Sequence, residues 1–346
     1  MTTDVLEGTD IARSNSYRPG LIDRVLQIVD RLPGPAYGWW AAVGIALAVI
    51  GHILVWMSTE RPLGVIHDDI ATPALIFAWF AWLTHTLNRV ATVSFDEFRP
   101  VLGDPGSEHK YRYQLTHIHD GRAVLAAVIA VAVVSFAYYV GVRPLRVPAP
   151  AEIERISSPL WGLTAAALGV VVLHTLTQNR LVSRLSAVAR NVDIFKPGPI
   201  NAFSRLTVVS AIGLILFVIA FVLFSPEQPI AYIIQEAIVM AIAVASFVLP
   251  LRIMHNRLVV EKARLLAESQ DRLKAVLTRI HEQVDANQLD RAEQLHHTLT
   301  AVLAERDVLA KLHTWPWSAG TFRGFASALL LPILLIMFTQ FVDRLL

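Results

Sequence analysis

The sequence predicts an all-α protein, a polytopic membrane helix bundle of about seven transmembrane helices with a cytoplasmic antiparallel coiled-coil hairpin. Three observations carry this prediction. The 346 residues are 54% hydrophobic and 17% charged, and their mean hydropathy is +0.50, which is too apolar for an ordinary soluble domain. Apolar runs of about 18 to 22 residues recur, and a helix needs roughly that length to cross a bilayer. One long polar segment late in the chain repeats leucine at helical spacing.

Residues 1–37 are expected to form a cytoplasmic tail that contains an amphipathic helix. Within Leu21–Leu32, the apolar residues Leu21, Val25 and Ile28 fall near one helical face, and the acidic and basic residues fall elsewhere. Such a helix is expected to lie on the inner membrane surface with its apolar face in the lipid. The first long apolar run begins only near Gly38, so we expect no cleaved signal peptide.

Residues 38–250 are expected to form a six-helix transmembrane bundle, and three two-helix repeats are one way to arrange it. A seventh transmembrane helix follows within residues 315–346. The apolar runs that predict these helices are 38–58, 72–92, 123–142, 160–179, 205–224, 229–250 and 324–342.

Residues 251–314 are expected to form a cytoplasmic helical hairpin whose first arm continues the sixth helix. Apolar residues recur there at three-to-four spacing on both sides of the polar stretch "DANQLD", as two antiparallel helices require. The sequence "TWPW", Thr314–Trp317, then marks the return to the membrane. Trp315 and Trp317 are predicted to anchor the chain at the interface, and Pro316 breaks the helix.

The loops between the apolar runs alternate in their content of arginine and lysine. Because basic loops favour the cytoplasmic side, the alternation predicts a cytoplasmic N-terminus and an outside C-terminus. Three similar segments, "LTHTLNRV", "LHTLTQNRLV" and "MHNRLV", then end helices two, four and six on that side. Their Asn-Arg pairs are Asn88 with Arg89, Asn179 with Arg180, and Asn256 with Arg257.

These Asn-Arg pairs have two interpretations. They mark a cytoplasmic boundary, with each guanidinium among the lipid headgroups, or they record duplication of a two-helix unit. The neighbouring histidines His85, His174 and His255 precede their arginines by different spacings, so they fall at different angles and depths on their helices. A symmetric site of three histidines is therefore not expected.

Ionisable residues inside the bilayer are the candidates for function, because such groups are costly there. Glu236 and His52 are predicted to lie at similar depth near the outer face, with Gln235 beside them. Together they would form an intramembrane site for a proton or cation. The alternative is that Glu236 is neutral and hydrogen-bonded within the bundle, and that His52 forms a hydrogen bond with a neighbouring group.

His85 and His174 form a second polar layer nearer the inner face, where structural hydrogen bonds are the expected role. The alternative is that the two histidines are axial ligands of a b-type haem. The sequence does not show the glycines that a macrocycle needs nearby. No metal site is expected: cysteine is absent, and the "HIHD" segment His117–Asp120 offers metal-ligand types without a fourth partner. No catalytic motif is visible, so the chain is not expected to be an enzyme.

Several segments together resemble one family of bacterial multi-pass membrane proteins that has no assigned activity. They are "FRPVL", "KYRYQLT", "DIFKPGPINAFSRLT", "HNRLVVEKARLL" and "AERDVLAKLHTWPWSAGTFRGFASALLLP". The likeness covers about half of the chain. It implies the same topology and a place in the bacterial plasma (inner) membrane, and it transfers no site residue and no cofactor.

The functional hypothesis is a channel or transporter for ions or small solutes, with the hairpin serving gating or assembly. The alternative is a membrane signalling or scaffold protein that recruits partners through the hairpin. The expected partners are the lipid bilayer, a second copy of the chain and a cytoplasmic protein bound by residues 251–314. Nucleic acid is not an expected partner.

Overall fold

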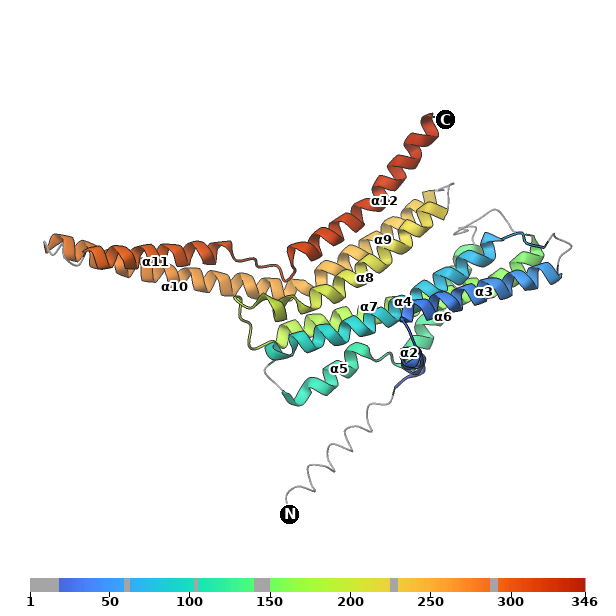
Figure 1. Ribbon diagram of the computed structural model, residues 1–346, viewed down its shortest axis with the longest axis horizontal. Helices are drawn as coiled ribbons and strands as arrows, with labels where there is room; N and C mark the ends of the chain where they lie inside the picture. The colour runs from blue at the N-terminus through green and yellow to red at the C-terminus, as the bar shows by residue number, and fades with distance from the viewer. Residues whose placement is uncertain are drawn as a thin grey trace, which may run out of the picture.

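The computed structural model describes residues 19–58, 63–102, 105–139, 150–224, 230–286 and 292–345, and every regular element within them is helical (Figure 1). The α-helices are α2 (Leu21–Arg31), α3 (Ala36–Ser58), α4 (Asp68–Leu102), α5 (Glu108–Thr116), α6 (Asp120–Tyr139), α7 (Ala151–Val188), α8 (Pro197–Phe224), α9 (Ile230–Val248), α10 (Arg252–Asp285), α11 (Ala292–Lys311) and α12 (Ala319–Leu345). Two short 3-10 turns, η1 (Pro105–Ser107) and η2 (Leu249–Leu251), precede α5 and α10. The prediction of an all-α fold is confirmed.

Six helical segments of the described chain are long and apolar enough to span a membrane, which is compatible with an integral membrane protein. They are Ala36–Ser58, Asp68–Leu102, Glu108–Phe136, Ala151–Val188, Pro197–Ala220 and Ala237–Asp285. These segments contain or overlap the first six predicted runs. The seventh run falls in α12, where the apolar helix Ala319–Leu335 is shorter than those six.

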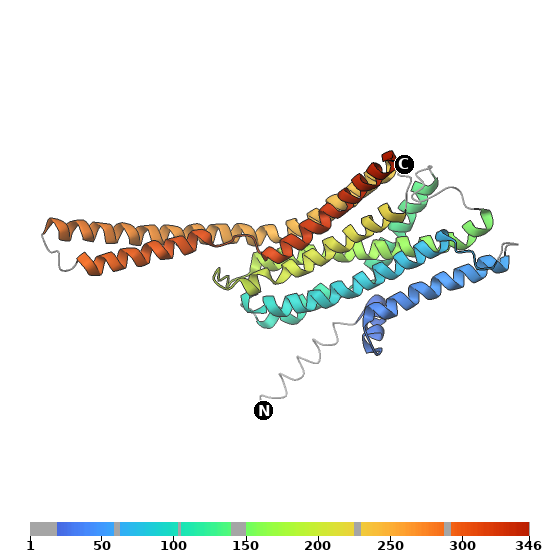
Figure 2. The same cartoon turned by 45° about the horizontal axis from the view of Figure 1, so that its top comes forward.

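Helix α4 lies at the centre of the bundle, between α3, α7 and α8 (Figures 1 and 2). Helix α6 packs on α7, and α9 and α12 pack on α8. The core is filled by large apolar side chains such as Phe80, Leu87 and Phe95 of α4, and the rings of Phe98 and Phe203 join α4 to α8 with centroids 4.8 Å apart. The apolar runs therefore fold as a packed bundle with α4 as its axis.

Glycine allows α6 and α7 to approach closely. A Cβ atom added at Gly169 of α7 would lie 2.5 Å from the carbonyl oxygen of Ala126 and 2.8 Å from the Cβ of Ala130. Small residues at such crossings let helix backbones approach each other, which is how helices commonly associate in membranes. The α6–α7 contact is therefore specified by Gly169 itself.

The segment Pro197-Gly198-Pro199 begins α8. Helix α7 ends at Val188, and α8 starts at Pro197 itself. Proline is well suited to the first turn of a helix, because the missing N–H would have no partner there and the fixed φ already matches the helix.

Helices α10 and α11 form the long arm that leaves the bundle. After α9, the 3-10 turn at Leu249–Leu251, which contains Pro250, leads directly into α10. Helix α11 returns beside α10 in the opposite direction in both views (Figures 1 and 2). Arg272 of α10 pairs with Glu305 of α11 at 3.0 Å, both on exposed surface. We call the end of the bundle from which this arm leaves the hairpin end.

The root of the arm is fixed by stacked rings. His255 stacks on Trp315 with centroids 3.9 Å apart, and Trp315 stacks on Trp317 at 4.3 Å. Trp317 in turn stacks on Phe247 of α9. Lys262 donates to the carbonyl oxygens of Ala310 and Leu312 at 2.7 and 2.8 Å, which satisfies free carbonyls at the end of α11. Trp315 and Trp317, predicted as interface anchors, are half-buried and join α9, α10 and α12.

Candidate functional site

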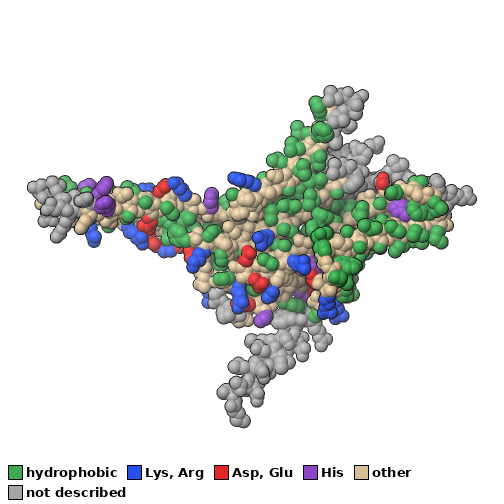
Figure 3. Space-filling view, viewed as in Figure 1, with side chains coloured by type: hydrophobic (Ala, Val, Ile, Leu, Met, Phe, Trp, Pro, Cys, Tyr) green, Lys and Arg blue, Asp and Glu red, His purple; other side chains and the backbone are tan. Residues whose placement is uncertain are grey.

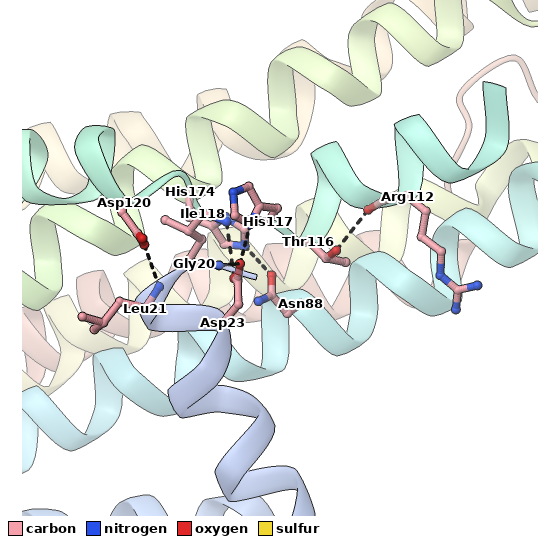
Figure 4. A network of polar contacts seen from close by, with 10 residues as sticks. All are labelled: Gly20, Leu21, Asp23, Asn88, Arg112, Thr116, His117, Ile118, Asp120 and His174. Atoms are coloured by element: carbon pink, nitrogen blue, oxygen red, sulfur yellow. Dashed lines mark hydrogen bonds and ion pairs between the residues drawn. The ribbon is translucent and has the colours of Figure 1, made fainter. Parts of the chain in front are cut away.

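Helix α2 is docked on the bundle by a buried carboxylate. Asp23 is 9% exposed and accepts hydrogen bonds from the Nδ1 of His117, from the backbone N–H of Gly20 at 2.9 Å and from that of Ile118 at 3.4 Å (Figure 4). A carboxylate that is taken out of water needs several such donors, and Asp23 has three. The "HIHD" segment therefore serves as the docking platform for α2.

Two further carboxylates hold the same helix. Asp120 accepts a hydrogen bond from the backbone N–H of Leu21 at 2.7 Å, which satisfies a free donor in the first turn of α2. Asp30 lies at the other end of α2, where its Oδ1 is 3.0 Å from Nε2 of His85 and 3.1 Å from a guanidinium nitrogen of Arg89. Helix α2 is thus fastened at both ends.

Helix α2 keeps the apolar stripe that its sequence predicts on the outside. Its apolar residues Leu21 and Ile28 are 67% and 57% exposed, as a lipid-facing stripe should be. Its acidic residues Asp23 and Asp30 bond to histidines of the bundle. The two residues are seven positions apart, and seven residues make almost two whole turns, so they share one face of the helix.

His85 has protein partners on both ring nitrogens. Trp40 Nε1 donates to His85 Nδ1 at 3.4 Å, so the proton of neutral His85 resides on Nε2, which donates to Asp30. The Nε2 of His174 lies 2.6 Å from Asn88 Oδ1 and 2.9 Å from Gln178 Nε2. Both rings are buried and hydrogen-bonded, which suits a structural role.

His52 is also satisfied by its own surroundings. Its Nδ1 donates to the carbonyl oxygen of Ala48 at 2.7 Å, and its Nε2 accepts from the backbone N–H of His67 at 2.8 Å. The side chains of Gln235 and Glu236 lie outside the described residues. Their helix α9 packs on α8, whereas α3 with His52 packs on the other side of α4 (Figures 1 and 2).

A basic pocket of about 630 Å³ opens at the hairpin end, between α5, the start of α6 and the last turns of α7. Its polar lining consists of three arginines, three histidines, Tyr113, Gln114 and Thr177, and no carboxylate from the described part of the chain borders it. The six basic residues are Arg122, Arg180, Arg184, His117, His119 and His174. We call this cavity the basic pocket.

The arginines of the basic pocket differ from their neighbours because no described carboxylate pairs with them. Four other arginines at this end of the bundle are each paired: Arg89 with Asp30, Arg99 with Glu108, Arg112 with Asp96 and Arg205 with Glu97. The basic pocket therefore brings together three arginines that have no carboxylate partner among the described residues. Figure 3 shows charged side chains on the arm and around the middle of the molecule, and mainly hydrophobic ones beyond them.

The three Asn-Arg pairs take different structural positions. Asn88 contacts His174 and Arg89 pairs with Asp30, whereas Arg257 donates to the carbonyl oxygen of Ser186 at 2.8 Å. His174 and Ser186 are twelve residues apart on α7, roughly 18 Å along its axis. Asn179 is buried, Arg180 borders the basic pocket and Asn256 is exposed. The three pairs thus lie at different heights along the bundle. Of their six residues, only Arg180 lines the basic pocket.

Sequence reasoning found only part of the basic pocket. It named Arg180, His174 and the "HIHD" segment, the last as a weak candidate for metal binding, but it did not single out Arg122 or Arg184 as site residues. One signal was available, since Thr177, Arg180 and Arg184 follow at i, i+3 and i+7 on one face of α7. The residues that α5 and α6 contribute to the pocket could not be identified from the sequence, because their position depends on the path that the chain takes after α4.

Among the described residues, no group of three or more histidines, aspartates and glutamates is arranged to hold a metal ion. No protein family, no curated protein and no solved structure matches the chain, so the site is interpreted from its own geometry.

Proposed function

We propose that this protein is an integral membrane transport protein, a channel or transporter, whose substrate is an anion bound in the basic pocket. The observation that carries the proposal is a cluster of three arginines around a cavity of about 630 Å³, in which no described carboxylate pairs with an arginine or lines the cavity. A guanidinium recognises phosphate and carboxylate groups through paired hydrogen bonds, and cavities of this size suit small ligands. This narrows the earlier hypothesis of ions or small solutes to anions.

The proposed setting is the bacterial inner membrane, with the N-terminus and the arm in the cytoplasm and the C-terminus outside. The basic residues of the pocket and of the loops at the hairpin end support this orientation, because such residues are retained on the cytoplasmic side. Helix α12 is the proposed seventh span. On this topology the substrate enters the basic pocket from the cytoplasm.

The experiment is anion movement in liposomes that contain the purified full-length protein. Labelled phosphate, labelled sulfate and a fluorescent short-chain phosphatidylglycerol serve as substrates. We expect at least one of them to move faster than in protein-free liposomes. We expect Arg180→Ala with Arg184→Ala to reduce the rate about tenfold or more, because each lost charge-assisted contact is worth about 1.5 kcal/mol or more.

Arg279→Ala is the matched control, since Arg279 is an exposed arginine far along the arm. If none of the three anions moves with the wild-type protein, or if the control loses as much rate as the pocket variant, the proposal fails. Glu236→Gln is run in parallel. Loss of movement in that variant would support a proton- or cation-coupled role for Glu236 with Gln235 and His52.

The alternative function is a signalling or scaffold protein whose coiled-coil arm recruits partners or a second copy of the chain. The ring stack from His255 through Trp315 to Trp317 favours it, because the stack joins the arm firmly to α9 and α12. Deleting residues Glu268–Leu303 discriminates between the two functions. A scaffold loses its co-purifying complex on this deletion, whereas a transporter with an accessory arm keeps moving anions.

A further inference from the structure

A second cavity lies beside the basic pocket and has the opposite character. It has a volume of about 530 Å³ and is lined by α2, α3, α4, α6 and α7. Its walls are aliphatic and aromatic, with Phe80, Ala127, Leu163 and Val170 among them, and Thr84 and Asp120 are its polar exceptions. The carboxylate of Asp120 is already engaged by the backbone N–H of Leu21. We call this cavity the apolar groove.

The groove and the pocket follow one another along a single face of α7. Leu163, Ala167 and Val170 line the groove, and Leu173, Thr177, Arg180 and Arg184 line the pocket. These residues recur every three or four positions, so they form one stripe of the helix. Val170 in the groove and Arg180 in the pocket are about 15 Å apart along the axis, so the lining changes from apolar to basic within about three turns.

The "HIHD" segment borders both cavities. His117, Ile118 and His119 line the basic pocket, and Asp120 lines the apolar groove. The rim of the groove is open on the membrane-facing surface, where Leu21 of α2 is 67% exposed and Val124 of α6 is 62% exposed. A hydrocarbon chain lying against these helices can therefore enter the groove from the bilayer while the group at its end reaches the pocket.

We infer that the basic pocket and the apolar groove together form a site for an anionic lipid of the cytoplasmic leaflet. Its phosphate group binds among Arg122, Arg180 and Arg184, and an acyl chain lies in the groove. The inference rests on the proposed anion-binding function and names the source of the anion. Basic pockets between transmembrane helices on the cytoplasmic side are suited to lipid phosphates, and an apolar groove is filled better by a hydrocarbon chain than by water.

Native mass spectrometry of the full-length protein in a neutral detergent tests the inference with four probes. Dioleoyl phosphatidylglycerol carries both the anion and the chains, and dioleoyl phosphatidylcholine has the same chains on a headgroup without net charge. Glycerol 3-phosphate and inorganic phosphate carry the anion without chains. We expect phosphatidylglycerol to bind about tenfold or more tightly than phosphatidylcholine, the equivalent of one charge-assisted contact. We expect a preference of about tenfold or more over the two soluble anions as well, because they have no hydrocarbon chain to bury in the groove.

Two kinds of variant separate the headgroup from the chain. Arg180→Ala with Arg184→Ala should weaken phosphatidylglycerol binding about tenfold or more, and the matching pair of lysine substitutions should weaken it less, because the charge is kept. Ala127→Phe fills the groove and should also weaken lipid binding. Val128→Phe is its control, since Val128 is the next residue of α6, is 59% exposed and does not border the groove. The thermal unfolding midpoint of each variant shows whether it is folded.

The outcomes distinguish this inference from the proposed function. If glycerol 3-phosphate or inorganic phosphate binds as tightly as phosphatidylglycerol, the ligand is a soluble anion, so the lipid inference is overturned and the anion function stands. If phosphatidylcholine binds as tightly, or if a folded Ala127→Phe protein binds lipid like the wild type, the lipid inference is also overturned. If no probe binds the wild-type protein, both proposals fail.

Discussion

Asp23 and His117, which are 94 positions apart in the chain, are hydrogen-bonded to each other beneath α2. This contact sets the orientation of the amphipathic helix. With Asp23 held against the "HIHD" segment and Asp30 against His85, the apolar residues of α2 are left on the outside. Helix α2 thereby lines the apolar groove and contacts His85 of the inner polar layer.

Replacing Asp23 by alanine should destabilise the docking of α2. The change leaves the His117 ring and the backbone N–H of Ile118 without their acceptor, and each unsatisfied buried donor costs about 1–3 kcal/mol. We expect a lower thermal unfolding midpoint in detergent and faster hydrogen exchange over residues 21–31. Asp271→Ala, at an exposed position of the arm, is the control and should change neither measurement. Equal exchange in both variants would contradict the docking role.

Gly169→Ala should destabilise the contact between α6 and α7. The added Cβ would lie 2.5 Å from a backbone oxygen, which cannot move aside as a flexible side chain could. Overpacking of this kind costs about 1–3 kcal/mol. Gly162→Ala is the matched control on the same helix, because nothing lies within 4 Å of a Cβ there. The control should be neutral or up to about 1 kcal/mol stabilising by helix propensity. The thermal unfolding midpoints of the two variants in detergent test this prediction. Equal midpoints would mean that Gly169 is not needed for the close contact between α6 and α7.

The antiparallel arm can be checked by crosslinking, because the chain has no cysteine of its own. Arg272→Cys with Glu305→Cys should be joined by a short bis-maleimide, since the native side chains meet at 3.0 Å. Glu282→Cys with Glu305→Cys should not be joined, because residue 282 is displaced by about 15 Å along α10. Proteolysis within 286–292 followed by electrophoresis shows whether the two arms stay linked. Efficient crosslinking of the second pair alone would mean a different register.

The proposed topology predicts which single cysteines are reachable from each side. Leu63 lies between α3 and α4, on the proposed outside, and is 82% exposed. A cysteine introduced by Leu63→Cys should therefore react with an impermeant maleimide in intact cells. Arg279→Cys on the arm should react only after the membrane is permeabilised. The reverse pattern would invert the topology and place the basic pocket outside the cell.

The candidate site was predictable only in part, and particular residues show why. His85 and His174 were expected to make structural hydrogen bonds, and their partners suit that role: Trp40 and Asp30 for His85, Asn88 and Gln178 for His174. Asp30 escaped notice because an acidic residue on an amphipathic helix usually faces water. Its shared face with Asp23 was readable, but the basic and histidine partners come from α4 and from the "HIHD" segment, far away in sequence.

The sequence by itself determined the all-helical class, the six apolar helices and the continuation of α9 into the arm. These features depend on runs of apolar residues, on helical periodicity and on proline, all of which act over short distances along the chain. Only the tertiary structure decided that Asp23 of α2 is buried against His117, that Trp315 packs on His255 and that Arg122 meets Arg180 and Arg184 around one cavity. These contacts join segments that are far apart in the sequence. The residue pattern of one helix does not determine which other helix packs against it.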